Sequence, residues 1–350
     1  MLLIVVLSNI LLIFISLVST TNFLEIFSLN ETSNLKLLQN YALFKINMDR
    51  LSVGLQPVSL SDNKAAQYHA DEILKSELLS HWSKNGLKPY MLYSLHNGTG
   101  YVQQNIGQIS YVNTDDTVKG ITSHSFCTNN SKIYCEPLDP FDSIDKLENS
   151  MIFNDFLCCQ NGHKNNILDK LHTNVSIGIA YNKYYFVFVQ NFENNYLRYN
   201  FSNENEQEFL IEAKILDPKE NLHLSHISIY FDNLPNQIDY EENKNKLNYS
   251  MGKLELIISK PLESYEQYVQ PESYSIIEAE NWDIHNEDIN ILFRLPNDLQ
   301  INDRMVTMVM YADNKTKNPS IPDISYGTFQ RELFPLTSYT LPNKAVSGID

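Results

Sequence analysis

Two adjacent apolar runs near the middle of the chain constrain its fold more than any other feature. Val175–Tyr181 and Tyr184–Phe192 consist mainly of β-branched and aromatic residues, and only Asn182-Lys183 separates them. This composition and the two-residue connection predict an antiparallel hairpin. Segments with helical spacing and one short strand precede it: helices are expected over 41–51, 66–74, 141–157 and 162–168, and the strand over 101–106. Helices flanking a small antiparallel sheet make an α+β layered domain.

The second half of the chain has a different pattern. A polar stretch over 196–207, rich in Asn and Glu, has the composition of a linker. Beyond it, short apolar runs follow one another without amphipathic helices, and strands are expected over 209–215, 226–231, 253–259, 289–294 and 305–311. This arrangement predicts a β-sandwich. We therefore expect a first domain over 38–195, a sandwich-like domain over 208–335 and a tail over 336–350.

The N-terminus carries an uncharged apolar segment. Residues 2–18 are interrupted only by Ser8, Asn9 and Ser16, and the first lysine is Lys36. The segment is at the lower limit for a membrane-spanning helix and exceeds the apolar core of a typical signal peptide. Residues 1–20 are therefore expected to be either a cleaved signal peptide or an N-terminal membrane anchor, followed by a polar spacer over 21–37. Both alternatives predict a secreted or cell-surface protein.

Cysteines and glycosylation sequons agree with export. The chain has four cysteines, an even number that favours disulfides outside the cell, and their three alternative pairings stay open: the candidates are Cys127, Cys135, Cys158 and Cys159. Adjacent cysteines rarely bond to each other, because the peptide between them must distort. Seven N-x-[ST] sequons are glycosylation candidates, at Asn30, Asn97, Asn129, Asn174, Asn200, Asn248 and Asn314.

Charge and missing motifs exclude several classes of function. Asp and Glu number 42 against 26 Lys and Arg, so the net charge is -16 and the pI about 5.0. A nucleic-acid binder needs a basic surface to neutralise phosphates, so no nucleic-acid partner is expected. The GxGxxG, GxxxxGK[ST], HExxH and GxSxG patterns are absent from the sequence, which removes the familiar nucleotide-binding and hydrolase signatures.

Short motifs of the first half resemble one known family when they are taken in order. They are Asn47–Arg50, Gly54–Val58, Ala65–Ala70, Ser80–Trp82, Gln104–Ile106, Gly162–Leu168, Val175–Ala180 and Val189–Phe192. Together they resemble a CAP domain of prokaryotic type, the SCP domain of cysteine-rich secretory proteins, antigen 5 and pathogenesis-related 1 proteins, over roughly residues 40–195. The resemblance implies an α-β-α sandwich, usually secreted.

The resemblance also implies a cleft in which two histidines meet two acidic residues. His81 and His163 occupy the histidine positions, and Gln104, followed by Asn105, stands where the family has a glutamate. Glu148 has about the spacing of the second acidic residue, with Asp155 as its rival. Two neutral imidazoles can bind zinc, whereas an amide can only form hydrogen bonds. We therefore expect either no cofactor or a weakly bound zinc ion on His81 and His163.

Several neighbouring side chains have two interpretations. Cys159 and His163 are four residues apart, which fits a thiol–imidazole pair or a zinc corner, but in an exported chain a disulfide is favoured. An oxidised loop over 127–135 is expected to hold the rim of the cleft. His69 is expected to be a hydrogen-bonded core residue. Trp82, with Tyr90 and Tyr93, would either line the mouth of the cleft or pack in the core.

Three hypotheses for function follow. The first is an exported binding or interaction module with a vestigial histidine cleft and no catalysis, whose partner is a protein, glycan or lipid at the cell surface. The second is a metal-dependent, protease-like hydrolase that uses His81 and His163. The third is a lipid or sterol binder, as the resemblance implies for some members of the family.

Overall fold

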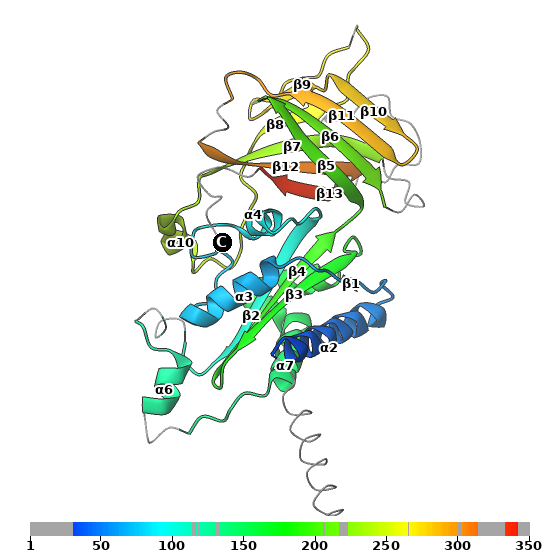
Figure 1. The fold of residues 1–350 in the computed structure, drawn as a ribbon. Coiled ribbons are helices and arrows are strands. Elements are labelled where there is room, and N and C mark those ends of the chain that lie inside the picture. The colour runs from blue at the N-terminus through cyan, green and yellow to red at the C-terminus, as the bar shows by residue number, and fades with distance from the viewer. Residues whose placement is uncertain are drawn as a thin grey trace, which may run out of the picture.

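The computed structural model shows two bodies, one of helices around a sheet and one built of strands (Figure 1). It describes residues 31–113, 117, 119–129, 134–205, 207–216, 223–264, 266–299, 301, 303–313 and 333–341. The apolar run over 2–18 and the sequons at Asn30 and Asn314 lie outside these residues. Within the described part of the chain, no helix is both long and apolar enough to span a bilayer.

The first domain mixes helices with one sheet, as expected. Its elements are α2 (Glu31–Ser52), β1 (Ser59–Leu60), α3 (Ala65–Ser76), α4 (Pro89–Leu95), β2 (Tyr101–Ser110), α6 (Ser123–Asn129), α7 (Pro140–Phe153), α8 (Asp155–Cys159), α9 (Gly162–Ile167), β3 (Asn174–Tyr181) and β4 (Tyr185–Asn194). The predicted hairpin is confirmed, since β3 and β4 pair antiparallel. The strand order is β1-β3-β4-β2, so β2 is an edge strand.

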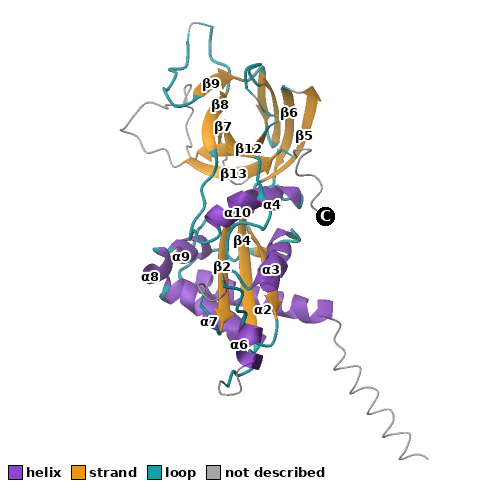
Figure 2. Cartoon of the chain, turned by 90° about the vertical axis from the view of Figure 1, so that its left-hand side faces the viewer, coloured by secondary structure: helices purple, strands orange, loops and turns teal. Residues whose placement is uncertain are grey.

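The sheet is covered by helices on both faces, which explains the nearly continuous apolar sequence of β4. Phe186, Phe188 and Phe192 pack with α2 and α7, whereas Tyr185 and Val187 on the opposite face pack with α3. Every residue of β4 is buried. Helices lie on either side of the sheet in Figure 2, and the α+β class is confirmed.

The motif residues that open the first domain are structural. Arg50 is fully buried, and its guanidinium donates to the backbone carbonyls of Gln56, Ile167, Asp169 and His172 at 2.7–3.3 Å. A buried charge needs such partners, because an unpaired one would cost several kcal/mol, as an order of magnitude. Arg50 therefore joins the end of α2 to the segment that leads from α9 into β3.

Close packing of α3 on β3 depends on one glycine. A Cβ atom placed on Gly178 would lie 2.0 Å from the carbonyl oxygen of Ala66, far inside van der Waals contact. Only glycine therefore lets the helix backbone approach the strand this closely.

The second domain is a sandwich of two sheets. Its elements are β5 (Leu197–Asn205), β6 (Glu208–Ile215), β7 (His223–Asn233), α10 (Gln237–Asn243), β8 (Lys253–Ser259), β9 (Ser275–Glu278), β10 (Asn281–His285), β11 (Asp288–Arg294), β12 (Arg304–Asp313) and β13 (Leu333–Thr340). The sheets have the orders β10-β11-β6-β5 and β13-β12-β7-β8-β9. One apolar core that includes Phe209, Ile229, Phe293 and Met308 is shared by both sheets.

The predicted linker over 196–207 is wrong, because most of it forms β5. Leu197, Tyr199 and Phe201 alternate along this strand and pack in the sandwich core, while the polar residues between them face outward. β4 ends at Asn194 and β5 begins at Leu197, so the chain passes almost directly from one sheet into the other.

Two other predicted boundaries also need correction. Residues 336–340, assigned to a tail, belong to β13, which pairs with β12, so the sandwich extends beyond residue 335. The spacer assigned to 21–37 overlaps α2, which begins at Glu31. Residues 342–350 lie outside the described part of the chain.

Polar contacts hold the two domains together. Asp232 of β7 accepts hydrogen bonds from Lys88 Nζ (2.7 Å) and from Tyr90 Oη (2.6 Å). Along β13, Ser338 Oγ donates to the carbonyl oxygen of Gly100 at 3.2 Å. Beside these bonds, buried Met305 of the sandwich packs in an apolar cluster of the first domain. The junction is therefore a packed interface, and it forms around β2 and α4 (Figure 2).

Candidate functional site

A cavity of about 260 Å³ lies at the edge strand β2, where the two domains meet. The first domain lines it with His81, Gln104, Asn105, Cys159, His163 and Asn166, among others. The loop between α10 and β8 of the sandwich adds Leu247, Asn248, Tyr249 and Met251. The structure thus brings both candidate histidines, Gln104 and Asn105 to one cavity, but Glu148 does not line it.

His81 lies on the α3 side of β2 and is held by Gln104. His81 Nδ1 is 3.0 Å from Gln104 Oε1, and Gln104 Nε2 donates to Asn191 Oδ1 at 3.1 Å. This order makes Gln104 Oε1 the acceptor and assigns the imidazole proton to Nδ1. Burial lowers the pKa of His81 to about 4, although the bond to Gln104 favours the charged form. The ring is therefore neutral at neutral pH.

The α7 side of β2 carries a second chain of hydrogen bonds. Asn105 Nδ2 donates to Gln190 Oε1 at 3.0 Å and to the carbonyl oxygen of His163 at 3.1 Å. Gln190 Nε2 then donates to Glu148 Oε2 at 2.7 Å. Burial raises the pKa of Glu148 to about 8. Glu148 is thus a buried support beneath the cavity and reaches His163 only through two amides.

Asp155, the rival of Glu148, is the acid that contacts His163. Its Oδ1 lies 2.6 Å from His163 Nδ1, and its Oδ2 accepts from the backbone N–H of Lys164 at 3.1 Å. The carboxylate is buried, whereas the imidazole is partly exposed. An acceptor at Nδ1 holds the proton on that nitrogen and leaves Nε2 as the basic nitrogen of the ring. The spacing along the sequence favoured Glu148 as the acid beside His163. It does not indicate Asp155, because the helix breaks at Asn154 and a new helix begins.

All four cysteines lie within disulfide distance of a partner. Cys127 bonds to Cys135 with Cα atoms 5.6 Å apart, and the adjacent Cys158 and Cys159 bond to each other. The expectation that adjacent cysteines do not pair is therefore wrong here. The pairing is consistent with an oxidising compartment.

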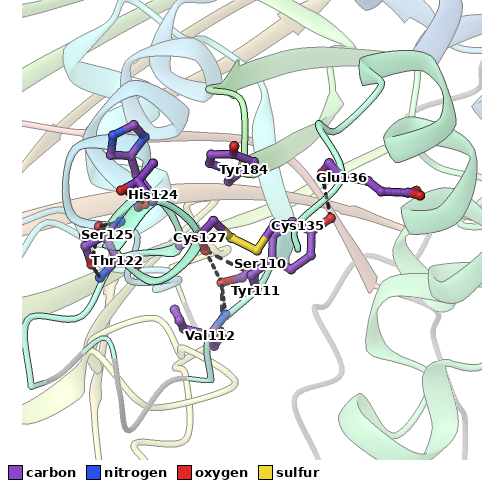
Figure 3. The surroundings of a disulfide bond; sticks show 12 residues. Ser110, Tyr111, Val112, Thr122, His124, Ser125, Cys127, Cys135, Glu136 and Tyr184 are labelled. Atoms are coloured by element: carbon purple, nitrogen blue, oxygen red, sulfur yellow. Dashed lines mark hydrogen bonds between the residues drawn. A yellow bond between two sulfur atoms is a disulfide. The ribbon is translucent and has the colours of Figure 1, made fainter. Parts of the chain in front are cut away.

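The Cys127–Cys135 bridge does not lie at the cleft, which corrects a second expectation. Figure 3 shows it beside Ser110 and Tyr184, at the end of β2 remote from Tyr101, and Tyr101 lines the cavity. Ser110 Oγ and Ser123 Oγ are 2.8 Å apart there. The bridge therefore joins α6 to Cys135 near the far end of the sheet.

Potential metal ligands gather around His163. Among the described residues, Asp155, Cys158, Cys159 and His163 each offer one ligand atom, and these four atoms lie within 4.8 Å of one another. His81 is outside this group. The structure thus adds a second set of potential ligands beside the predicted pair of His81 and His163, and two of its members, Cys159 and His163, line the cavity.

Tyr249 is the cavity-lining residue that the sequence did not indicate. It comes from an irregular loop of the sandwich, and its Oη accepts a hydrogen bond from the backbone N–H of Gln104 at 3.0 Å. Its ring centroid lies 5.1 Å from that of His81 and 6.5 Å from that of Trp82. Tyr249 also lines a second cavity of about 620 Å³, together with Trp82 and Lys246 among others. No periodicity marks this loop, so only the tertiary fold reveals it.

The remaining candidates have simpler roles. His69 Nε2 is 2.7 Å from the carbonyl oxygen of Ser80, as expected for a hydrogen-bonded core residue. Tyr93 is buried and donates to Glu193 Oε2 at 3.0 Å, so it packs in the core and does not line the cavity. The described sequon residues are half-buried at Asn174 and exposed at Asn97, Asn129, Asn200 and Asn248.

No protein-family model matches the chain, and no curated protein matches it.

Proposed function

We propose that the chain is an exported CAP-type binding protein without catalytic activity, and that its ligand occupies the cavity between the two domains. The observation that carries this proposal is the composition of the cavity wall. Imidazoles, carboxamides and phenols from both domains converge there, and most of them already hold one another through hydrogen bonds. Such a wall supplies donors and acceptors without supplying an acidic group at position 104.

The chemistry of the wall favours a small uncharged polar ligand, the class to which sugar residues belong. Amides such as Asn166 and Asn248 donate and accept, as hydroxyl groups require, and the rings of Tyr101 and Tyr249 offer apolar faces. Drug-sized ligands occupy cavities of roughly 300–1,000 Å³. A cavity of about 260 Å³ suits one small polar group better than a sterol.

Two tryptophan substitutions in the loop between α10 and β8 test the proposal. Asn248 is exposed and borders the cavity, whereas Asn245, three residues earlier in the same loop, is exposed and does not border it. Binding of the purified chain to an array of glycans is measured for the wild type, Asn248→Trp and the matched control Asn245→Trp. We expect glycan binding that Asn248→Trp abolishes and Asn245→Trp retains. Absence of glycan binding by the wild type, or equal binding by both variants, would contradict the proposal.

A metal-dependent hydrolase is the second candidate, and the contact between Asp155 and His163 is the observation that favours it. A carboxylate on Nδ1 leaves Nε2 of a cavity-lining imidazole as a general base toward water. Turnover of casein and of chromogenic peptide and glycoside substrates is measured with zinc and with a chelator. Hydrolysis that is lost in the chelator and in His163→Ala would establish this candidate and remove the non-catalytic one.

A further inference from the structure

The turn between α8 and α9 brings together four potential metal ligands, two of which, Cys159 and His163, also line the cavity. Asp155 begins α8, Cys158 and Cys159 end it, and His163 is the second residue of α9. Their four potential ligand atoms lie within 4.8 Å of one another. Two sulfurs, one imidazole nitrogen and one carboxylate oxygen are a donor set that zinc and other thiophilic ions take in tetrahedral sites.

The backbone of this turn is strained in a way that maintains the cluster. Gln160 and Asn161 have φ values of 52° and 65°, in the left-handed region that few residues other than glycine adopt. Such conformations cost on the order of 1–3 kcal/mol each and persist where the surrounding structure imposes them. Here they reverse the chain between Cys159 and His163, so that the imidazole lies against Asp155.

The protein already orients two of the four donors. Asp155 is buried, and the backbone N–H of Lys164 donates to its Oδ2 at 3.1 Å. The other oxygen of Asp155 fixes His163 through Nδ1 at 2.6 Å. Partners of this kind orient metal ligands and raise metal affinity by roughly 10–100-fold.

The oxidation state of the sulfurs decides whether the cluster can bind a metal ion. In the bridged form neither sulfur is a thiolate, which is the form that binds a metal. A thiol reductant of the solvent supplies two electrons and two protons, so that the bridge opens to two thiols while the reductant becomes a disulfide. A divalent ion then replaces the two thiol protons, which pass to water.

The cluster is also accessible to both reagents. Cys158 is exposed, and Cys159 and His163 are half-buried at the wall of the cavity. The other bridge differs, because Cys135 is buried and no such cluster includes Cys127 or Cys135 among the described residues. The chain therefore contains its own control for an ordinary disulfide.

We propose that opening of the Cys158–Cys159 bridge by a thiol reductant creates a binding site for one thiophilic divalent ion, such as zinc, with Asp155 and His163 completing the ligand set. The oxidised chain does not bind the ion at this place. Since Cys159 and His163 also line the cavity, the bound ion changes its wall. This inference is independent of the proposed ligand of the cavity.

Cobalt(II) is the spectroscopic probe for the test, because thiolate–cobalt bonds give a charge-transfer absorption in the near ultraviolet. The chain is reduced with a phosphine, which is oxidised by taking the oxygen of one water molecule, and the phosphine is removed under nitrogen. We expect one equivalent of cobalt to produce the absorption in the reduced chain and none in the oxidised chain. Zinc should displace the cobalt. Equal absorption by both forms, or none by either, would overturn the proposal.

Cysteine variants test which side chains bind the cobalt ion. Cys158→Ser/Cys159→Ser should lose the charge-transfer absorption, with a fall in zinc affinity on the order of 100-fold or more. Cys127→Ser/Cys135→Ser, the matched control, should retain it after reduction, and so should His81→Ala. Loss of the absorption in the control pair with retention in Cys158→Ser/Cys159→Ser would overturn the assignment.

A measurement on the wild type makes the result independent of how the variants fold. The reduced chain is alkylated with iodoacetamide with and without zinc, and the modified peptides are counted by mass spectrometry. We expect zinc to slow alkylation of Cys158 and Cys159 at least tenfold and to leave Cys127 and Cys135 unprotected. Equal rates at Cys158 and Cys159 with and without zinc would refute the site.

Discussion

The two faces of the edge strand β2 carry polar networks of different kinds. On the face toward α3, His81 is held by Gln104 through uncharged groups. On the face toward α7, Asn105 and Gln190 lead to Glu148, a carboxyl group enclosed by the core. The difference teaches that two neighbouring residues of one strand can line the same cavity while only one of them is linked to a carboxyl group in the core.

The two buried acids near the α7 side of β2, Glu148 and Asp155, differ in the hydrogen bonds that they accept. Glu148 accepts one hydrogen bond, its Oε1 has no partner among the described residues, and burial raises its pKa to about 8. Asp155 is as deeply buried but accepts from His163 and from a backbone N–H. The number of donors, and not burial alone, distinguishes an acid that supports the core from an acid that orients a site residue.

The largest expected effect comes from replacing the ionisable carboxyl group of Glu148. Between its ordinary pKa of 4.5 and the folded value of about 8, the folded state retains a proton that the unfolded state releases, so the free energy of unfolding falls as pH rises. Glu148→Gln should remove this fall and stabilise the fold at pH 7 by on the order of 3 kcal/mol, with little change at pH 4. Urea unfolding from pH 4 to pH 8 measures it.

The matched control is Glu136→Gln, because Glu136 is exposed. It should leave the free energy of unfolding unchanged at every pH. If Glu148→Gln destabilised the fold equally at pH 4 and pH 8, the carboxyl group would not be the buried proton carrier that the comparison requires.

The second effect concerns Asp155. Asp155→Asn keeps one acceptor oxygen but removes the charge from the bond to His163, and we expect a loss of about 2 kcal/mol, as for hydrogen bonds to charged groups. Asp142→Asn is the control, since its ion pair with Lys146 at 2.7 Å is exposed and screened by solvent, and it should leave the stability almost unchanged. Thermal unfolding of both at pH 7 makes the comparison. Equal losses of stability in the two variants would show that the contact between Asp155 and His163 contributes no more than an exposed ion pair.

The smallest expected loss of stability concerns the contact between Tyr249 and β2. Tyr249→Phe removes only the hydroxyl that accepts from the backbone N–H of Gln104, and it should cost about 1 kcal/mol. Tyr134→Phe, at a side chain that is 84% exposed, should cost nothing measurable. Urea unfolding of the two variants measures the difference. An unchanged stability in Tyr249→Phe would mean that the loop covers the cavity without being held there.

The sequence predicted the secondary structure best where one side-chain pattern decides it. The hairpin of β3 and β4 was predictable because aromatic and β-branched residues leave no alternative to a buried strand. β5 was missed because the polar residues of 198–205 obscure the alternation of Leu197, Tyr199 and Phe201. There the core of the sandwich, and not local composition, determines the strand.

The site was predictable only in part, for a geometric reason. His81, Gln104, Asn105 and His163 lie near motif segments whose order fixes their neighbourhood, and they do line one cavity. The choice between two acids depended on where α7 ends, and the role of Tyr249 depended on how a distant domain packs. Neither has a signature in the linear spacing of residues.

The position of Tyr249 against Trp82 gives the junction an optical signal of its own. The chain has two tryptophans: Trp82 is 5% exposed at the junction, and Trp282 lies in β10 of the sandwich. In a Trp282→Phe chain, emission would come from an indole whose edge-to-face neighbour belongs to the other domain. Withdrawal of the loop would hydrate that indole and shift its emission to longer wavelength. Stopped-flow fluorescence could therefore time the opening of the cavity without an added dye.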